Sequence, residues 1–333
     1  MRKISIAFVI ALALISFSLP AAPPSMAASD AIQIKIQTWG GPSYPSRIAL
    51  ENMNKKLNAS GRFTVKYFAQ QSLIPANKVA DGLRKGVLDI GEAAVGYHVD
   101  LFGLVGEVQW MPRNFNFEKF RDHYRDPGGY FDFNKPYFDK LGLKLLIDFH
   151  TPPSVLCSTK QVKIVDDLKG MMIRDTGTMT PWFKLLGITP VNINVNELYE
   201  GFSRKMLNGH FTSTSAYMAN KWYEVAKYVT DFDWFLPGVT LEMSKPFYDG
   251  LPADAKAILD KAVLEAEKEM FQIAKEQDDA DVKTMTAKGV VITPRNEAEM
   301  KKIDATIQPY FDSLGQKYGQ QWTEFLKIQK TLK

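Results

Sequence analysis

The chain has 333 residues, of which 45% are hydrophobic and 12% aromatic, and its formal net charge at pH 7 is +4. This length permits two domains with apolar cores, and so mild a basic balance gives no argument for nucleic-acid binding. The single cysteine, Cys157, excludes an internal disulfide, so the fold has to be stabilised by its apolar core.

The N-terminus has the pattern of a secretory signal. Arg2 and Lys3 precede an apolar run, Ile4 to Leu19, and prolines and small residues follow it. The run is shorter than the roughly 20 apolar residues that span a bilayer, which argues against a membrane anchor. We expect residues 1–27 to be a signal peptide that is cleaved near Ala27, and the mature chain to be exported to the periplasm.

Strands and helices alternate in the first part of the predicted mature chain. Strand patterns cover 31–39, 63–70 and 87–95, with helical patterns between them at 46–60 and 76–86. This order predicts a parallel sheet with helices on its faces.

A second alternating set follows a Phe- and Tyr-rich stretch of helix and loop at 115–138. Its predicted strands are 141–150, 152–160, 171–175 and 188–194, and its helices 165–170, 178–187 and 195–209. Because no Gly/Ser-rich linker separates the two sets, we expect strands to cross between two lobes around Leu145 to Leu156.

The longest helical pattern covers 251–289 and would be about 50 Å long. We expect this helix to begin with Asp254 as its N-cap and to brace both lobes. Two further helices are predicted at 297–306 and 320–332. The predicted fold is therefore α/β with two lobes and a cleft between them. We assign 28–151 and 238–275 to lobe I, and 152–237 and 276–333 to lobe II.

Motifs of known catalytic and cofactor sites are absent. The sequence contains no HExxH, GxSxG, P-loop, GxGxxG or CxxC pattern. The four histidines, at positions 98, 123, 150 and 210, are scattered without metal-ligand spacing. We therefore expect no metal and no cofactor, although missing motifs do not exclude an enzyme.

Candidate ligand contacts are the residues at the predicted strand ends, because ligands of open α/β sheets bind at the carboxyl edge. They are Trp39, Glu92, Phe149, His150, Arg174, Thr212, Ser213, Trp234 and Phe235. An arginine offers a planar fork of donors that matches a carboxylate, and aromatic faces suit an apolar or flat body. By position alone, Arg174 could equally be a surface charge, and the aromatic residues could belong to the core.

The stretch 167–209 resembles a known family. It contains "DLKGMMIR" (Asp167 to Arg174), "LGITPV" and "NELYEGFSRKMLNG", while "GLRKGVLDIGEA" lies upstream and "NKWYEVAKYVTD" downstream. In this order the motifs are similar to those of the substrate-binding proteins of tripartite ATP-independent periplasmic (TRAP) transporters. The resemblance covers most of the predicted mature chain. It implies two α/β lobes that close over a small organic acid and a long helix that braces both lobes.

The resemblance also implies roles for individual residues. The last arginine of the family's "KIR" motif usually holds the ligand carboxylate, and this role falls on Arg174. Glu92 matches a pocket glutamate of members that bind sugar acids. The chain departs from such members at three positions: Ser154 replaces a second arginine, Thr212 an asparagine, and Val195 a phenylalanine. These departures argue against a sialic-acid-type ligand.

The sequence therefore predicts a solute-binding protein that delivers an organic acid to the membrane subunits of a TRAP transporter. We expect a monocarboxylate with an apolar or aromatic body, held by Arg174 and Thr212 and enclosed by Trp39, Phe149 and Trp234. A monomer is the default expectation. Two alternatives stay open: an exported binding protein that serves a signalling receptor, and an exported enzyme on the same scaffold.

Overall fold

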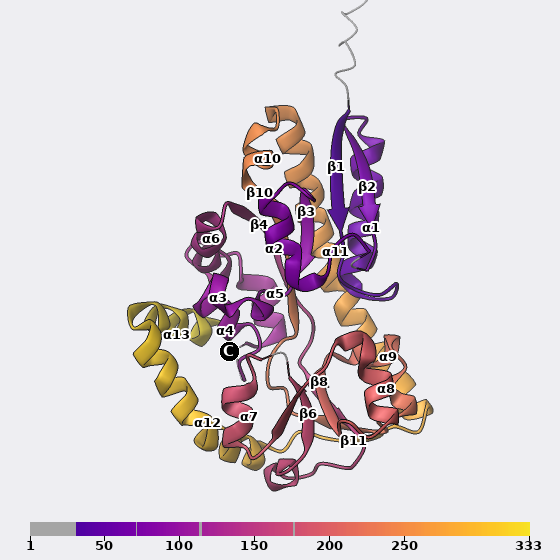
Figure 1. Ribbon diagram of the computed structural model, residues 1–333, viewed down its shortest axis with the longest axis vertical. Helices are drawn as coiled ribbons and strands as arrows, with labels where there is room; N and C mark the ends of the chain where they lie inside the picture. Colours follow the sequence, from indigo (N-terminus) through magenta and orange to yellow (C-terminus); the bar gives the residue numbers. More distant parts are fainter. Residues whose placement is uncertain (1–30, 71, 113–114, 176) are drawn as a thin grey trace, which may run out of the picture.

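The computed structural model describes residues 31–70, 72–112, 115–175 and 177–333 (Figure 1). The predicted signal peptide, residues 1–27, lies outside this part of the chain. Across the described ranges, none of the helices combines the length and the apolar character that a membrane span requires.

The first sheet has five strands in the order β2-β1-β3-β10-β4. Their bounds are β1 Ile32–Gln37, β2 Phe63–Phe68, β3 Ile90–Ala93, β4 Leu143–His150 and β10 Gly238–Ser244. Strand β1 is parallel to β2 and β3, as predicted, whereas β10 is antiparallel to both β3 and β4. The parallel arrangement predicted for β1, β2 and β3 is confirmed, and β10, which no pattern marked, inserts from far along the chain and makes the sheet mixed.

Helices cover this first part of the fold. The bounds are α1 Pro45–Ala59, α2 Val79–Arg84, α3 Val99–Phe102, α4 Leu104–Val108, α5 Phe117–His123, α6 Tyr130–Lys140 and α10 Lys245–Gly250. Helix α1 starts at a proline, which is favoured in the first helical turn because its missing N–H is not needed there. Its buried face includes Leu50, Met53 and Leu57.

The second sheet has six strands in the order β11-β9-β5-β8-β6-β7. Their bounds are β5 Val155–Ser158, β6 Met172–Asp175, β7 Thr189–Asn192, β8 Gly209–Thr212, β9 Tyr228–Asp231 and β11 Val291–Thr293. Strand β6 is parallel to β7 and β8, while β5 is antiparallel to β8 and β9. Helices α7 Thr180–Leu185, α8 Leu198–Ser203 and α9 Thr214–Ala219 connect these strands.

Two extended segments carry the chain between the sheets, in addition to the helical connection from β10 through α10 and α11 (Ala253–Ala287) to β11. The first joins β4 to β5, where the sequence predicted a crossing, and the second returns from β9 to β10. They are hydrogen-bonded to each other: the Thr151 amide donates to the Pro237 carbonyl at 2.8 Å, and the Ser154 amide donates to the Phe235 carbonyl at 2.8 Å. The two crossings therefore form a paired connection between the lobes.

Helix α11, Ala253–Ala287, braces both halves of the fold, as predicted (Figure 1). It packs on α1 and β4 beside the first sheet and on α9 beside the second. The N-cap prediction is wrong: Pro252 occupies the N-cap position. Asp254 lies in the first turn, where its carboxylate accepts a hydrogen bond from Arg62 Nε at 2.7 Å.

The last two helices are α12 Glu297–Tyr318 and α13 Gln320–Leu332. Helix α12 continues past its predicted end at 306, with Pro309 inside it. It packs on α7, whereas α13 packs on α5 and α6, which are both assigned to lobe I by sequence. The predicted lobe boundaries stay a prediction.

Candidate functional site

A cavity of about 210 Å³ lies between the two sheets. Its wall combines the segments after β1 and β3, parts of β6, β8 and α9, and the returning crossing. The apolar and aromatic lining residues include Trp39, Tyr44, Tyr97, Trp110, Met179, Phe211, Trp222 and Phe235. This position matches the predicted cleft at the carboxyl edges of the parallel strands.

Arg174 presents an unpaired positive charge to this cavity. Its side chain is only 8% exposed. Nε donates to the Ile193 carbonyl at 3.3 Å and Nη2 to the Tyr97 hydroxyl at 3.4 Å. No acidic side chain of the described residues forms an ion pair with Arg174, whereas the partly buried Arg125 binds Glu267 at 2.7 Å. A buried charge without a counter-charge is costly, so Arg174 is suited to bind an anion.

Two further polar side chains share the sheet face of Arg174. Strand β6 is parallel to β8 with Ile173 opposite Gly209, so Arg174 and His210 are neighbours across the pair. Thr212 follows two residues later and therefore points to the same side. Arg174, His210 and Thr212 all line the cavity and are all buried.

His210 is electrically neutral in this environment. Burial and the nearby Arg174 guanidinium lower the pKa of His210 well below its ordinary value. Its ring meets Trp222 edge-on, with centroids 5.2 Å apart. Its buried Nδ1 has no hydrogen-bond partner within the described part of the chain.

Ser213 also lines the cavity, but its hydroxyl is already used. Its Oγ accepts a hydrogen bond from the Ala216 amide at 3.1 Å and so caps the N-terminus of α9. The same hydroxyl lies 3.0 Å from the Ser215 hydroxyl. Ser213 therefore positions α9 against the cavity.

Glu92 lies behind the lining and not in it. One carboxylate oxygen accepts from the Trp39 amide at 2.7 Å, and the other accepts from the Ser46 hydroxyl. Burial raises the pKa of Glu92, while these hydrogen bonds oppose the shift. Because both oxygens are engaged, the predicted ligand contact is replaced by a supporting role: Glu92 holds the segment that carries Trp39 and Tyr44.

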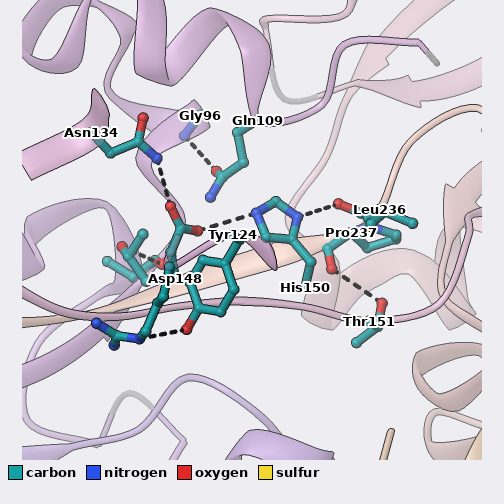
Figure 2. Close-up of polar contacts among 12 residues, drawn as sticks. Gly96, Gln109, Tyr124, Asn134, Asp148, His150, Thr151, Leu236 and Pro237 are labelled. Atoms are coloured by element: carbon teal, nitrogen blue, oxygen red, sulfur yellow. Dashed lines mark hydrogen bonds and ion pairs between the residues drawn. The ribbon is translucent and has the colours of Figure 1, made fainter. Parts of the chain in front are cut away.

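His150 is likewise outside the cavity, in a buried polar network (Figure 2). Its Nδ1 lies 2.7 Å from the Leu236 carbonyl oxygen, and its Nε2 lies 3.1 Å from Asp148 Oδ1. Asn134 donates to the other Asp148 oxygen at 2.7 Å. This network anchors the returning crossing, whose Pro237 does line the cavity.

Three more predicted contacts belong to the interior. Phe149 packs on Phe271 of α11, with ring centroids 5.3 Å apart. Trp234 stacks on Phe232 at 4.8 Å. The Ser154 hydroxyl accepts from the Phe235 amide at 3.4 Å. None of Phe149, Ser154 and Trp234 lines the cavity, because the sheet and the paired crossings turn these side chains into the core.

Several lining residues were not predicted. They are Tyr44, Tyr97, Trp110, Met179, His210, Phe211 and Trp222. Tyr97 comes soon after the end of β3, where the strand-end rule that selected Trp39 could also have found it. His210 alternates with Thr212 in one strand, a signal for a shared face. Trp110 comes from a connecting segment that no sequence pattern marks, and Trp222 lies in the motif "NKWYEVAKYVTD", which indicated the family but no contact with the cavity.

Gly238 is expected to be intolerant of a side chain. A Cβ atom there would lie 2.5 Å from Nδ1 of the buried His150 ring. We expect Gly238→Ala to lower the free energy of unfolding by about 1–3 kcal/mol, as overpacking does, measured by urea denaturation. Gly250→Ala is the matched control because no atom would lie within 4 Å of its Cβ. An equal loss of unfolding free energy in both variants would contradict the close approach of residue 238 to the His150 ring.

The described residues contain no group of three or more His, Cys, Asp or Glu side chains that could hold a metal ion. The polar side chains of the cavity wall are one guanidinium, one imidazole, the amides of Gln70 and Asn220, and several Ser, Thr and Tyr hydroxyls, set among aromatic rings. Such a set binds a small anion with an apolar part.

Comparisons with known proteins identify the family of this chain. The family model of bacterial extracellular solute-binding proteins, family 7, matches residues 37–317. The C4-dicarboxylate-binding periplasmic protein DctP of Vibrio cholerae is 22% identical over 270 residues, covering 79% of this chain and 80% of that protein.

Two solved structures share the fold. The sugar acid binding protein DctPAm of Advenella mimigardefordensis, in complex with galactonate, is 20% identical with a TM-score of 0.83, covering 91% of this chain and 99% of that chain. DctP7 of Bordetella pertussis, an extracytoplasmic solute receptor binding pyroglutamic acid, is 19% identical with a TM-score of 0.81. The match covers 90% of this chain and 100% of that chain. Because the family model spans most of the sequence, this chain belongs to the bacterial extracellular solute-binding proteins of family 7, the solute receptors of TRAP transporters.

Proposed function

We propose that the protein captures a small organic acid in the cavity between its lobes and delivers it to the membrane subunits of a TRAP transporter. One observation carries this proposal: Arg174 is a buried guanidinium that lines an aromatic cavity and lacks an acidic partner among the described residues. A ligand carboxylate supplies the missing counter-charge through two parallel hydrogen bonds.

The lining supports a monocarboxylate. Arg174 is the sole Arg, Lys, Asp or Glu among the described lining residues, so a second carboxylate would be buried without a cationic partner. The aromatic residues around it, including Trp39, Tyr97 and Phe235, favour an apolar or aromatic body. The Thr212 hydroxyl is placed to assist the carboxylate from the same sheet face.

The named ligands of the relatives are consistent with this class. The proteins compared above bind galactonate, pyroglutamic acid and C4-dicarboxylates, each of which carries a carboxylate. The shared feature supports Arg174 as the carboxylate partner. The aromatic lining of this chain supports a less hydroxylated body than that of galactonate.

Binding requires no covalent chemistry. When the lobes close, water leaves the cavity, and the attraction between the guanidinium and the carboxylate strengthens in the lower dielectric. The ligand favours the closed state by its higher affinity for that state. The paired crossings and α11 connect the lobes and are the segments that must bend. This role places the mature chain in the periplasm, with residues 1–27 removed on export.

A thermal-shift screen of the mature protein tests the proposal. We expect apolar and aromatic monocarboxylates to raise the melting temperature, since a ligand at 100 times its Kd stabilises the folded state by about 2.7 kcal/mol. Succinate and gluconate are the matched controls for a second carboxylate and for a hydroxylated body. Stabilisation by gluconate alone would contradict the proposed ligand class, and stabilisation by no acid would contradict the receptor function.

A further inference from the structure

We propose that His210 recognises a hydroxyl group on the ligand carbon next to the carboxylate, so that the cavity is selective for 2-hydroxy monocarboxylic acids. This inference rests on the proposed function, because it takes Arg174 as the partner of the carboxylate. It adds a second recognition element at the same site.

The sheet register brings His210 next to Arg174. Ile173 of β6 is paired with Gly209 of β8 in a parallel arrangement, and the next residue of each strand is Arg174 and His210. Neighbouring strands lie about 4.8 Å apart. Both side chains line the cavity. Adjacent groups of one ligand can therefore contact these two side chains at the same time.

One ring nitrogen of His210 is left for a hydrogen bond with a group outside the described residues. The buried Nδ1 lacks a hydrogen-bond partner in the described ranges. The neighbouring Cys157 thiol donates to the His210 backbone carbonyl at 3.3 Å and leaves the ring untouched. Trp222 contacts the ring edge-on and occupies an apolar side. Since buried polar groups are normally hydrogen-bonded, a ligand group is the natural partner.

The charge state of His210 selects the kind of group. Burial and Arg174 lower the pKa of His210 well below its ordinary value, so the ring is neutral at pH 7 and offers one donor and one acceptor. A neutral ring does not supply the counter-charge for a second carboxylate. A hydroxyl both donates and accepts, so it matches either tautomer of the ring.

Paired ligands test this inference by calorimetry on the full mature chain. The pairs are 3-phenyllactate with 3-phenylpropionate, and 2-hydroxy-4-methylpentanoate with 4-methylpentanoate, each enantiomer measured separately. Within a pair the body is the same and only the hydroxyl differs. For the wild type we expect one enantiomer of each hydroxy acid to bind about tenfold more tightly than the matching plain acid. The reason is that the plain acid leaves one buried polar group without a hydrogen-bond partner.

Substitution of the ring assigns the preference to His210. We expect His210→Phe to abolish the preference, so that the two members of each pair bind this variant with equal affinity. His210→Gln, which retains a donor and an acceptor, should restore part of the preference and guards against a folding defect in the first variant. His123→Phe is the matched control, because His123 is exposed and paired with Asp126 at 3.1 Å, away from the cavity.

The outcomes separate this inference from the proposed function. If the wild type binds both members of each pair equally, and Arg174→Ala binds neither, the proposed role of His210 is overturned. The protein is then still a carboxylate receptor. A hydroxyl preference that persists in His210→Phe also overturns it. Binding of none of these acids by the folded wild type overturns both proposals.

Discussion

Arg174→Ala is expected to weaken binding of the organic acid by at least about tenfold. The guanidinium is buried in the cavity wall, and its contacts with Ile193 and Tyr97 are long, at 3.3 and 3.4 Å. Removing it leaves the ligand carboxylate buried without a counter-charge, and hydrogen bonds to charged groups contribute about 1.5–3 kcal/mol. Isothermal titration calorimetry with a ligand from the thermal-shift screen measures the change.

Two companion variants make this result specific. Arg174→Lys keeps the charge but lacks the planar fork, so it should restore only part of the affinity. Arg204→Ala removes one positive charge from the exposed surface, where Arg204 pairs with Glu200, and should bind as the wild type does. Wild-type affinity in Arg174→Ala would refute the assignment of the carboxylate partner.

The ligand-free stability of Arg174→Ala separates loss of binding from loss of folding. Arg174 has no acidic partner among the described residues, and removing an unpaired buried charge relieves a desolvation cost. We therefore expect the free energy of unfolding without ligand to stay equal to that of the wild type or to rise. The melting temperature of the variant should no longer respond to the acid.

Glu242→Gln is expected to change how stability depends on pH. Glu242 lies in β10 with 0% exposure. One carboxyl oxygen is 2.8 Å from the Thr240 hydroxyl, and the other has no partner in the described part of the fold. Burial, with a smaller contribution from Asp148, raises the pKa of Glu242 from 4.5 to about 8. The side chain is therefore protonated at neutral pH.

The sign of the effect follows from proton binding. Between about pH 4.5 and 8, the folded state keeps a proton that the unfolded state has lost, so this group makes the protein less stable as the pH rises. The neutral amide that Glu242→Gln introduces does not titrate. We expect similar unfolding free energies for both proteins at pH 4.5, and a more stable variant by on the order of 4 kcal/mol at pH 8.5.

Urea denaturation at pH 4.5, 6.5 and 8.5 measures this difference. Glu200→Gln is the matched control, since Glu200 is exposed and its pairing with Arg204 contributes little. A difference between wild type and Glu242→Gln that stays constant with pH would show that the pKa of Glu242 is the same in the folded and unfolded states.

The local elements of the fold were largely predictable from sequence. Alternation marked β1 and β2, helical periodicity marked α1 and α11, and the motif ending in Arg174 indicated the family and, through it, the residue that we propose to bind the anion. These features depend on residues within one strand or helix, where periodicity and residue type carry the information.

Pairing between strands far apart in the sequence determined the features of the fold and of the site that were not predicted. A strand pattern gives two faces but names neither its partners nor its register, so β10 between β3 and β4 was not predicted. The same limit applies to the site. Trp39 and Phe235 line the cavity, whereas Phe149 and Trp234 lie in the core. Residue type alone does not predict which aromatic side chain lines the cavity and which is in the core.

The sequence by itself determined that two α/β halves are present, and its resemblance to a known family made Arg174 the candidate for holding an anion. Only the tertiary structure decided what surrounds Arg174. The parallel register of β6 and β8 places His210 beside it. Strands β3 and β4 hold Glu92 and His150 in supporting networks behind the wall. The physical reason is that burial and charge at the site arise from contacts between strands far apart in the chain.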